Sequence, residues 1–274
     1  QLFVSTGVES IYIKNGQCKG VALENGDIIE STSVISSAGV QNTLNKFLAN
    51  EPSLSKYRDN LKKVEPSSGH GCLYVGFDKT AKELGITNTN LWIYPSDDHD
   101  LNVEKYMNDE NEEFPLVYLS FASSKDPKWD ENYPGTATLE AIVPTSFDHY
   151  KKWNDKPWKK RGGEYLDYKE KFSQRIIDII YKQCPNLKDK ISYYELSSPL
   201  STRDMAHYEF GELYGANHTP SRFRQKWLKP KTPIKNLYLT GQDITTVGLP
   251  SALMSGMLTS STLLNKNLFK TLAK

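Results

Sequence analysis

The first 38 residues alternate apolar and polar positions in short runs, which is typical of β-strands. Asn15-Gly16 and Asn25-Gly26 stand between these runs, and such dipeptides favour tight hairpin turns. Ser36-Ser37-Ala38-Gly39 closes the last run, and residues 41–48 then have a helical pattern. The pattern predicts a small meander of strands at 8–13, 18–23, 28–29 and 34–35, followed by a glycine turn and a helix.

The middle of the chain mixes strand and helix signals without a regular alternation. Runs rich in β-branched and aromatic residues predict strands at 73–77, 91–94, 116–121 and 136–143. The clearest helix spans residues 164–184, where apolar residues recur at helical spacing before Cys184-Pro185-Asn186. Residues 97–113 hold eight acidic residues and a single lysine, which predicts a solvated loop.

Residues 236–274 return to an α/β pattern. Leu237-Tyr238-Leu239 reads as a short buried strand, a loop runs from Gly241 to Gly248, and residues 249–268 predict a buried helix with a proline in its first turn. No internal repeat is found. The chain is therefore predicted to be α/β with an α+β insert, with residues 1–50 and 236–274 forming two separated parts of one domain around residues 51–235.

Composition excludes several classes of protein. With 38% hydrophobic and 11% aromatic residues the chain has enough material for a core, and a net charge of +1 does not favour nucleic acid as a partner. The three cysteines are far apart, which favours a reducing compartment such as the cytoplasm over a disulfide framework. The five histidines lack metal-ligand spacing, so no metal site is predicted.

Residues 151–161 combine six cations with two tryptophans. One interpretation is a solvated loop. The other is a peripheral contact with an anionic membrane, where tryptophan favours the interface and each lysine contributes about 1 kcal/mol. The residues alone leave both open.

The loop between Gly241 and Ala252 is the strongest candidate for chemistry. A buried strand leads into a glycine turn, and the helix that follows offers free N–H groups, which attract anions or electron-rich ligand atoms. Glycine lets the backbone approach a flat ligand closely, and the Asp243 carboxylate can accept hydrogen bonds from sugar-like hydroxyls. An ordinary strand–turn–helix with Asp243 as a cap has the same pattern.

This loop resembles the flavin-contacting end of the carotenoid desaturase and retinol saturase branch of the FAD-dependent, amine-oxidase-like oxidoreductases. Nearly the whole chain shares the resemblance, and several upstream motifs are similar: Glu83-Leu84-Gly85, Pro134-Gly135, Lys160–Tyr165, Ser198–Thr202, Leu213–His218 and Pro230–Ile234. It implies an FAD-binding Rossmann-type domain at 1–50 and 236–274, around a mixed-sheet, substrate-binding domain at 51–235.

The resemblance also implies roles for single residues. Val8 would contact the adenine, Asp243 the ribityl chain or pyrophosphate, and the start of the last helix the isoalloxazine ring. The implied cofactor-binding set is Val8, Ala38, Gly39, Gly241, Gln242, Asp243, Gly248, Leu249, Pro250, Ser251 and Ala252. We expect Ala38-Gly39 and this loop to meet at one ligand-sized cleft. Tyr208, Tyr214 and His218 are candidates to line the substrate cavity, and no catalytic acid is identified.

The implied activity is oxidation or reduction of C=C bonds in a hydrophobic polyene such as a retinoid or carotenoid, with FAD as cofactor and NAD(P) as a candidate electron donor. The alternatives are a carotenoid cis–trans isomerase, and a non-catalytic lipid-docking or interaction module that has lost FAD.

One feature of the family is missing from these 274 residues: the strand, G-x-G-x-x-G turn and helix that hold the FAD pyrophosphate. Gly69-His70-Gly71 is no substitute, because a strand rather than a helix is predicted after it. We therefore expect such a segment upstream of Gln1 in a parent protein, and weak FAD binding by this chain alone.

Overall fold

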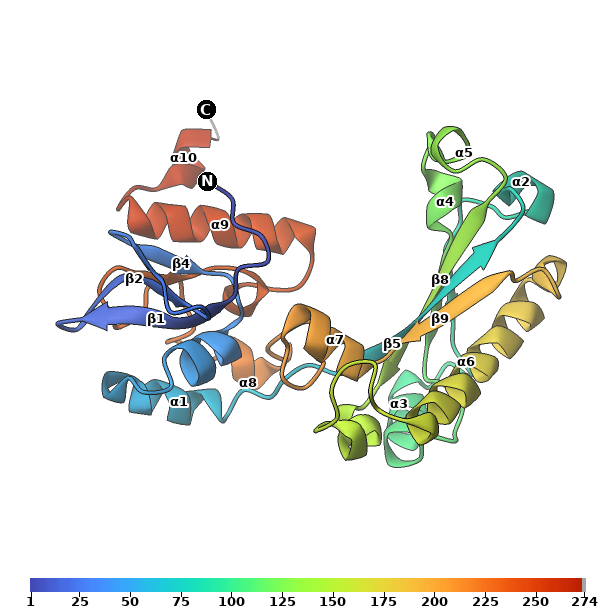
Figure 1. The fold of residues 1–274 in the computed structure, drawn as a ribbon, viewed down its shortest axis with the longest axis horizontal. Coiled ribbons are helices and arrows are strands. Elements are labelled where there is room, and N and C mark those ends of the chain that lie inside the picture. Colours follow the sequence, from blue (N-terminus) through green and yellow to red (C-terminus); the bar gives the residue numbers. More distant parts are fainter. Residues whose placement is uncertain (273–274) are drawn as a thin grey trace. The chain divides into compact units, whose positions relative to one another are not determined.

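A computed structural model describes residues 1–272, which form two compact units (Figure 1). The first unit combines residues 1–67 with the segment that begins at Tyr214, and the second is Ser68–Leu213. The chain thus leaves the first unit and later returns to it, as the predicted insert requires.

The borders of the insert differ from those expected at residues 50 and 235. Residues 51–67 and 214–235 lie in the first unit. Their apolar side chains join the same buried core as strand residues Ile11, Cys18 and Leu237: Leu54, Leu61, Val64, Ala216, Leu228 and Ile234. Sequence pattern alone does not reveal which of two cores such residues enter.

The meander at the start of the first unit is confirmed. Strands β1 (Val8–Lys14), β2 (Gln17–Leu23) and β3 (Ile28–Glu30) form an antiparallel sheet in that order. Asn15 and Gly16 both have positive φ, 53° and 69°, which is the geometry of a type I′ hairpin turn.

A parallel strand pair joins the two separated parts of the first unit. Strand β4 (Val34–Ser36) pairs with β10 (Leu237–Leu239), with Val34 opposite Leu237. After β4 comes a short π-helix, η1 (Asn42–Phe47), in place of the expected helix 41–48. The predicted helix 249–268 is two helices, α9 (Leu249–Leu263) and α10 (Leu268–Leu272), because Asn265 adopts a left-handed conformation with φ 50° between them. The unit's shorter helices are η2 (Pro52–Leu54), α1 (Ser55–Leu61), α8 (Pro220–Phe223) and η5 (Gln242–Ile244).

The second unit is built on a five-stranded antiparallel sheet of order β6-β7-β8-β5-β9. Four of its strands confirm predicted ones, and only β9 was not predicted: β5 (Gly69–Phe77), β6 (Leu91–Ile93), β7 (Val117–Ser120), β8 (Ala137–Thr145) and β9 (Tyr193–Ser197). Helix α6 (Gly163–Gln183) is the predicted long helix, and it runs along the sheet (Figure 1) with Phe172, Ile176 and Ile180 in the core. Short helices complete the unit: α2 (Ala81–Leu84), α3 (His99–Asn108), α4 (Ala122–Lys125), α5 (Trp129–Asn132), η3 (Phe147–Trp153), η4 (Pro185–Leu187) and α7 (Pro199–Ala206).

The acidic stretch 97–113 is not the solvated loop that its charge predicted. It contains helix α3, whose start is capped by the Asp98 carboxylate, 3.0 Å from the Leu101 nitrogen. Tyr106 is fully buried, and the buried Asn102 amide bonds Ser96. One buried face is enough to hold a helix whose other faces are charged.

Residues 151–161 differ from the expectation that both of their tryptophans could contact a membrane. Trp153 is buried between Tyr150, Tyr165 and Tyr168, so it cannot lie at a membrane surface. Trp158 is 47% exposed, with the Lys159 ammonium 4.7 Å from its ring centre. Within residues 1–272, no helix combines the length and the apolar character that crossing a membrane requires.

Candidate functional site

The predicted site lies in the first unit, where β4 and β10 both end. The Thr240 N–H donates to the Ser36 carbonyl oxygen at 2.9 Å. A few residues on, the Val40 N–H donates to the Asp243 carboxylate at 2.7 Å, across a sequence separation of 203 residues. The structure therefore places the Ala38-Gly39 turn beside the Gly241–Gly248 loop, as expected. The ligand-sized cleft between them stays a prediction.

Asp243 acts as an internal brace, that is, a side chain whose hydrogen bonds hold separate segments of the chain together. It is 5% exposed, and its second carboxylate oxygen accepts the Ala216 N–H at 2.9 Å. One side chain thus joins the turn after β4, the loop after β10 and the returning chain at Ala216. It does not cap α9, which was the ordinary alternative, and its contact with a ribityl chain or pyrophosphate remains a prediction.

Gly215 is required by this brace, and its replacement gives a first testable prediction. Its φ is +64°, and an added Cβ would lie 2.3 Å from the Asp243 Oδ1 atom. We expect Gly215→Ala to lower the free energy of unfolding by about 2–4 kcal/mol, from left-handed strain and a clash with a buried carboxylate. Urea denaturation measures this change. Gly26→Ala is the matched control, because Gly26 also has a positive φ but has open space for a Cβ; an equal loss in both variants would contradict the clash.

Arg222, which was not predicted from the sequence, binds backbone carbonyl groups of the Gly241–Gly248 loop. It is 2% exposed, and its Nη2 atom donates to the carbonyl oxygens of Gln242, Asp243 and Thr245 at 2.7, 2.7 and 2.9 Å. Among the described residues its Nε and Nη1 atoms have no partner. Burial lowers the pKa of Arg222, and the Asp243 charge opposes this. The carbonyl oxygens of the loop therefore converge on the buried, positively charged guanidinium group of Arg222.

The three residues proposed to line a substrate cavity are divided between the units. Tyr214 and His218 lie in the first unit, and Tyr208 lies in the second. Tyr214 is 44% exposed. The His218 Nε2 atom is buried without a partner in the described part of the chain. Burial first, and then the Arg222 charge, lower the pKa of His218, and the Asp243 charge opposes this. Their role in substrate binding stays a prediction.

The start of α9 fits an electron-rich, flat ligand. Its N-cap, Gly248, has φ 97°, Pro250 stands in the first turn, and within residues 1–272 the N-cap side chain makes no capping bond. The first backbone N–H groups of a helix have no intrahelical partner. Gly241 has φ 100° with open space around its Cα. The loop itself is fixed, because the Thr245 hydroxyl donates to the carbonyl oxygens of Gly241 and Ser251. Close backbone approach and fixed donors are what the flat isoalloxazine ring of a flavin would need here.

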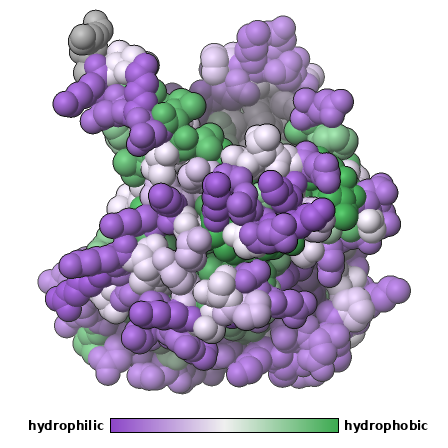
Figure 2. Space-filling model, turned by 90° about the vertical axis from the view of Figure 1, so that its left-hand side faces the viewer, coloured by the Kyte–Doolittle hydropathy of each residue, from purple (hydrophilic) through white to green (hydrophobic). Residues whose placement is uncertain are grey.

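Helix α9 also leaves apolar side chains in solvent. Leu249 is 79% exposed, Leu253 73% and Met254 46%. In the view of Figure 2, toward the first unit, the surface is largely hydrophilic. Hydrophobic residues are visible in its upper part, the level at which Figure 1 draws α9. A free helix start beside an apolar face is the mixed lining that cofactor sites have.

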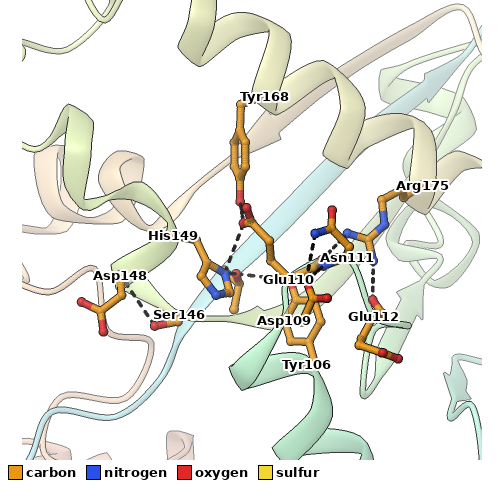
Figure 3. A network of polar contacts seen from close by, with 11 residues as sticks. Tyr106, Asp109, Glu110, Asn111, Glu112, Ser146, Asp148, His149, Tyr168 and Arg175 are labelled. Atoms are coloured by element: carbon orange, nitrogen blue, oxygen red, sulfur yellow. Dashed lines mark hydrogen bonds and ion pairs between the residues drawn. The ribbon is translucent and has the colours of Figure 1, made fainter.

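The second unit contains a polar network of its own, drawn in Figure 3. Tyr168 donates to the Glu110 carboxylate, and the His149 Nδ1 atom lies 3.7 Å from that carboxylate. Arg175 donates to the backbone oxygens of Glu110 and Glu112. Burial, and then the bond to Glu110, raise the pKa of Tyr168, which keeps its hydroxyl protonated. The network ties the segment after α3 to η3 and α6, and its members bond one another.

Known proteins similar to this chain are reductases and desaturases. All-trans-retinol 13,14-reductase of Rattus norvegicus is 33% identical over 97% of this chain and 46% of its own length. A Danio rerio relative named inactive all-trans-retinol 13,14-reductase is 30% identical over 97% of the chain and 46% of its length. The lycopene-forming phytoene desaturase of Pseudescherichia vulneris is 22% identical over 95% of the chain and 51% of its length. No protein-family model matches the chain.

Solved structures show the same fold. An oxidoreductase from Methanosarcina mazei has a TM-score of 0.55 at 14% identity, covering 95% of this chain and 49% of that one. A putrescine oxidase variant has a TM-score of 0.58 at 12% identity, covering 96% and 49%. These likenesses confirm the predicted α/β fold with its mixed-sheet insert. The chain spans about half the length of its relatives, and it is homologous to the all-trans-retinol 13,14-reductases over nearly all of its own residues.

Proposed function

We propose that this chain is the part of an FAD-dependent oxidoreductase that carries the second half of the flavin site and a domain for a polyene lipid. The observation that carries the proposal is the 33% identity to a retinol reductase over 97% of the chain. The substrate class is a retinoid- or carotenoid-like polyene, because the desaturase relative also carries a polyene in its name.

The geometry of the first unit supports this proposal. The Ala38-Gly39 turn and the Gly241–Gly248 loop are bonded to each other through Asp243. FAD, when bound, supplies the hydride chemistry. The chain's own contribution is position: Arg222 and Asp243 hold the loop, and the uncapped start of α9 presents backbone donors. NAD(P), the electron donor that the sequence suggested, finds no support in these similarities.

Activity can be tested after joining the chain to the amino-terminal half of the rat relative. We expect the joined protein to convert all-trans-retinol, with chemically reduced flavin, into a product that lacks one C=C bond. Chromatography with absorbance detection measures it. A reductase would give a product with a shorter conjugated system, which absorbs at shorter wavelength. The alternative, an isomerase, would return a product of unchanged mass and unchanged number of C=C bonds.

A glycine pair tests whether the start of α9 forms the site. Gly248→Ala is expected to lower activity at least about tenfold, because a φ of 97° strains alanine where the ligand is proposed to lie. Gly16→Ala is the matched control, since Gly16 also has a positive φ and open space but lies in the distant hairpin turn. Equal activity in the two variants would remove α9 from the site.

A non-catalytic module remains the second candidate, because a Danio rerio relative of equal coverage is named inactive. Under that alternative the joined protein would retain no flavin and convert neither retinol nor phytoene.

A further inference from the structure

A small basic cavity in the second unit is not explained by the flavin proposal. It has a volume of about 200 Å³ and lies between the end of the 151–161 segment, the start of α6, β9 and α7. Its lining includes Trp158, Lys159, Arg161, Tyr165, Lys169 and Glu195. Three of these are cations and one is an acid, so the cavity carries a positive charge.

Arg161 fixes part of that charge in the wall. It is 3% exposed, and its Nη2 atom lies 2.5 Å from the Asp204 carboxylate. Arg203 also binds this carboxylate, at 2.9 Å. Two guanidinium groups therefore share one counter-charge, and the buried Arg161 Nε–H has no acceptor in the described part of the chain. A buried cation that is only partly neutralised favours an anion nearby.

Lys169 adds an ammonium group to the lining of the cavity. Among residues 1–272 no carboxylate lies within 4.0 Å of its ammonium group, which stands 5.8 Å from the Tyr165 ring centre. Glu195, the acid in the lining, accepts the Tyr193 hydroxyl at 2.8 Å. Burial lowers the pKa of Lys169, the Glu195 charge opposes this, and the Arg161 charge adds to it. Such an ammonium group gains from an anionic partner.

The start of α6 adds backbone donors at the same place. Its N-cap, Gly162, has φ 83°, lines the cavity and provides no side-chain cap for a helix of 21 residues. A Cβ added at Gly162 or Gly163 would meet nothing within 4 Å, so a ligand can reach the backbone. The first N–H groups of a helix have no intrahelical partner, and together with the helix dipole they favour negative charge.

We propose that this cavity binds a phosphate monoester group, either in a soluble molecule or as the headgroup of a lipid. A phosphate monoester carries about −1.5 to −2 charges near pH 7 and three strong acceptor oxygens, which matches several cations plus backbone donors better than a single carboxylate does. Trp158 and Leu166, 47% and 62% exposed, add apolar surface at the lining. Tryptophan is enriched at the interface between membrane and water, so this surface suits a lipid whose headgroup is in the cavity.

The experiment uses the 274-residue chain and two kinds of probe. Inorganic phosphate and glycerol phosphate are titrated by calorimetry. Phosphatidylcholine vesicles containing 10% phosphatidic acid, or instead 10% phosphatidylglycerol, are tested by co-sedimentation; the first adds a monoester and the second a diester. Lys169→Gln is compared with Lys171→Gln, which changes an exposed lysine of the same helix that does not line the cavity.

We expect the wild-type chain and Lys171→Gln to bind at least one monoester probe, and Lys169→Gln to bind it roughly tenfold to a hundredfold more weakly. Binding of glycerol phosphate alone would assign the site to a soluble ligand. Preference for phosphatidic acid over phosphatidylglycerol would assign it to a lipid. Equal loss in both lysine variants, equal retention by both vesicle types, or no binding to any probe would overturn the proposal, and none of these outcomes bears on flavin binding.

Discussion

Asp243→Ala is expected to raise the rate of amide hydrogen exchange at Val40 and Ala216 by two to four powers of ten. Both N–H groups donate to the Asp243 carboxylate, at 2.7 and 2.9 Å. Each charge-assisted bond contributes about 1.5–3 kcal/mol, so the local stability of the first unit should fall by about 3–6 kcal/mol. Arg222 loses its nearby counter-charge as well. Hydrogen exchange followed by mass spectrometry, resolved to the segments that contain these residues, measures the effect.

Two further variants distinguish the effect of losing the Asp243 hydrogen bonds from the general effect of losing a negative charge. Asp243→Asn keeps one acceptor oxygen but presents an amide NH₂ group to the second N–H. The local stability lost in this variant should therefore be about half of that lost in Asp243→Ala. Asp59→Asn removes an exposed carboxylate of the same unit that pairs with Lys62, and it should leave exchange at Val40 unchanged. If Asp243→Ala exchanged no faster than Asp59→Asn, the three segments would be held by other contacts.

Elements with strong local signals were predictable from the sequence. The Asn15-Gly16 turn fixed the β1–β2 hairpin, because few other residues adopt positive φ at two successive positions. Helix α6 followed from its apolar spacing. Helix α3 was missed because a single buried tyrosine and a buried asparagine hold it, and its charges dominate the local pattern. Strand β9 has a pattern of mostly exposed or half-buried residues, which gives little signal.

Long-range relations were predictable only through the family resemblance. Pairing of β4 with β10 joins residues about 200 positions apart, and no periodicity encodes it. Asp243 shows the limit for single residues. Its sequence context indicated a ligand contact or a cap, whereas its partners are backbone N–H groups of distant segments. Arg222 lies in a short polar helix where an exposed arginine would look the same. Trp153 was grouped with Trp158 by spacing, although only packing decides which one is buried.

The largest expected effect concerns the cofactor: the 274-residue chain alone should bind FAD weakly or not at all. The Gly241–Gly248 loop and the start of α9 offer backbone donors, but the pyrophosphate carries most of the ligand's charge. Its expected partner, the helix after a G-x-G-x-x-G turn, is not encoded in these residues, and Gly69-His70-Gly71 lies inside strand β5. Two or three missing charge-assisted bonds, at about 1.5–3 kcal/mol each, weaken affinity by about two to six powers of ten. Titration followed by flavin fluorescence measures this.

Riboflavin is the informative control, because it has the isoalloxazine ring but no pyrophosphate. If the loop and α9 contact only the ring end, the chain should bind riboflavin and FAD with similar, weak affinity. Once the chain is joined to the amino-terminal half of a relative, it should bind FAD more tightly than riboflavin by the same two to six powers of ten, since the added helix N-terminus acts on the pyrophosphate alone. Submicromolar binding of FAD, but not of riboflavin, by the 274 residues would place the pyrophosphate anchor in this half, where Arg222 and the start of α9 are the groups that could provide it.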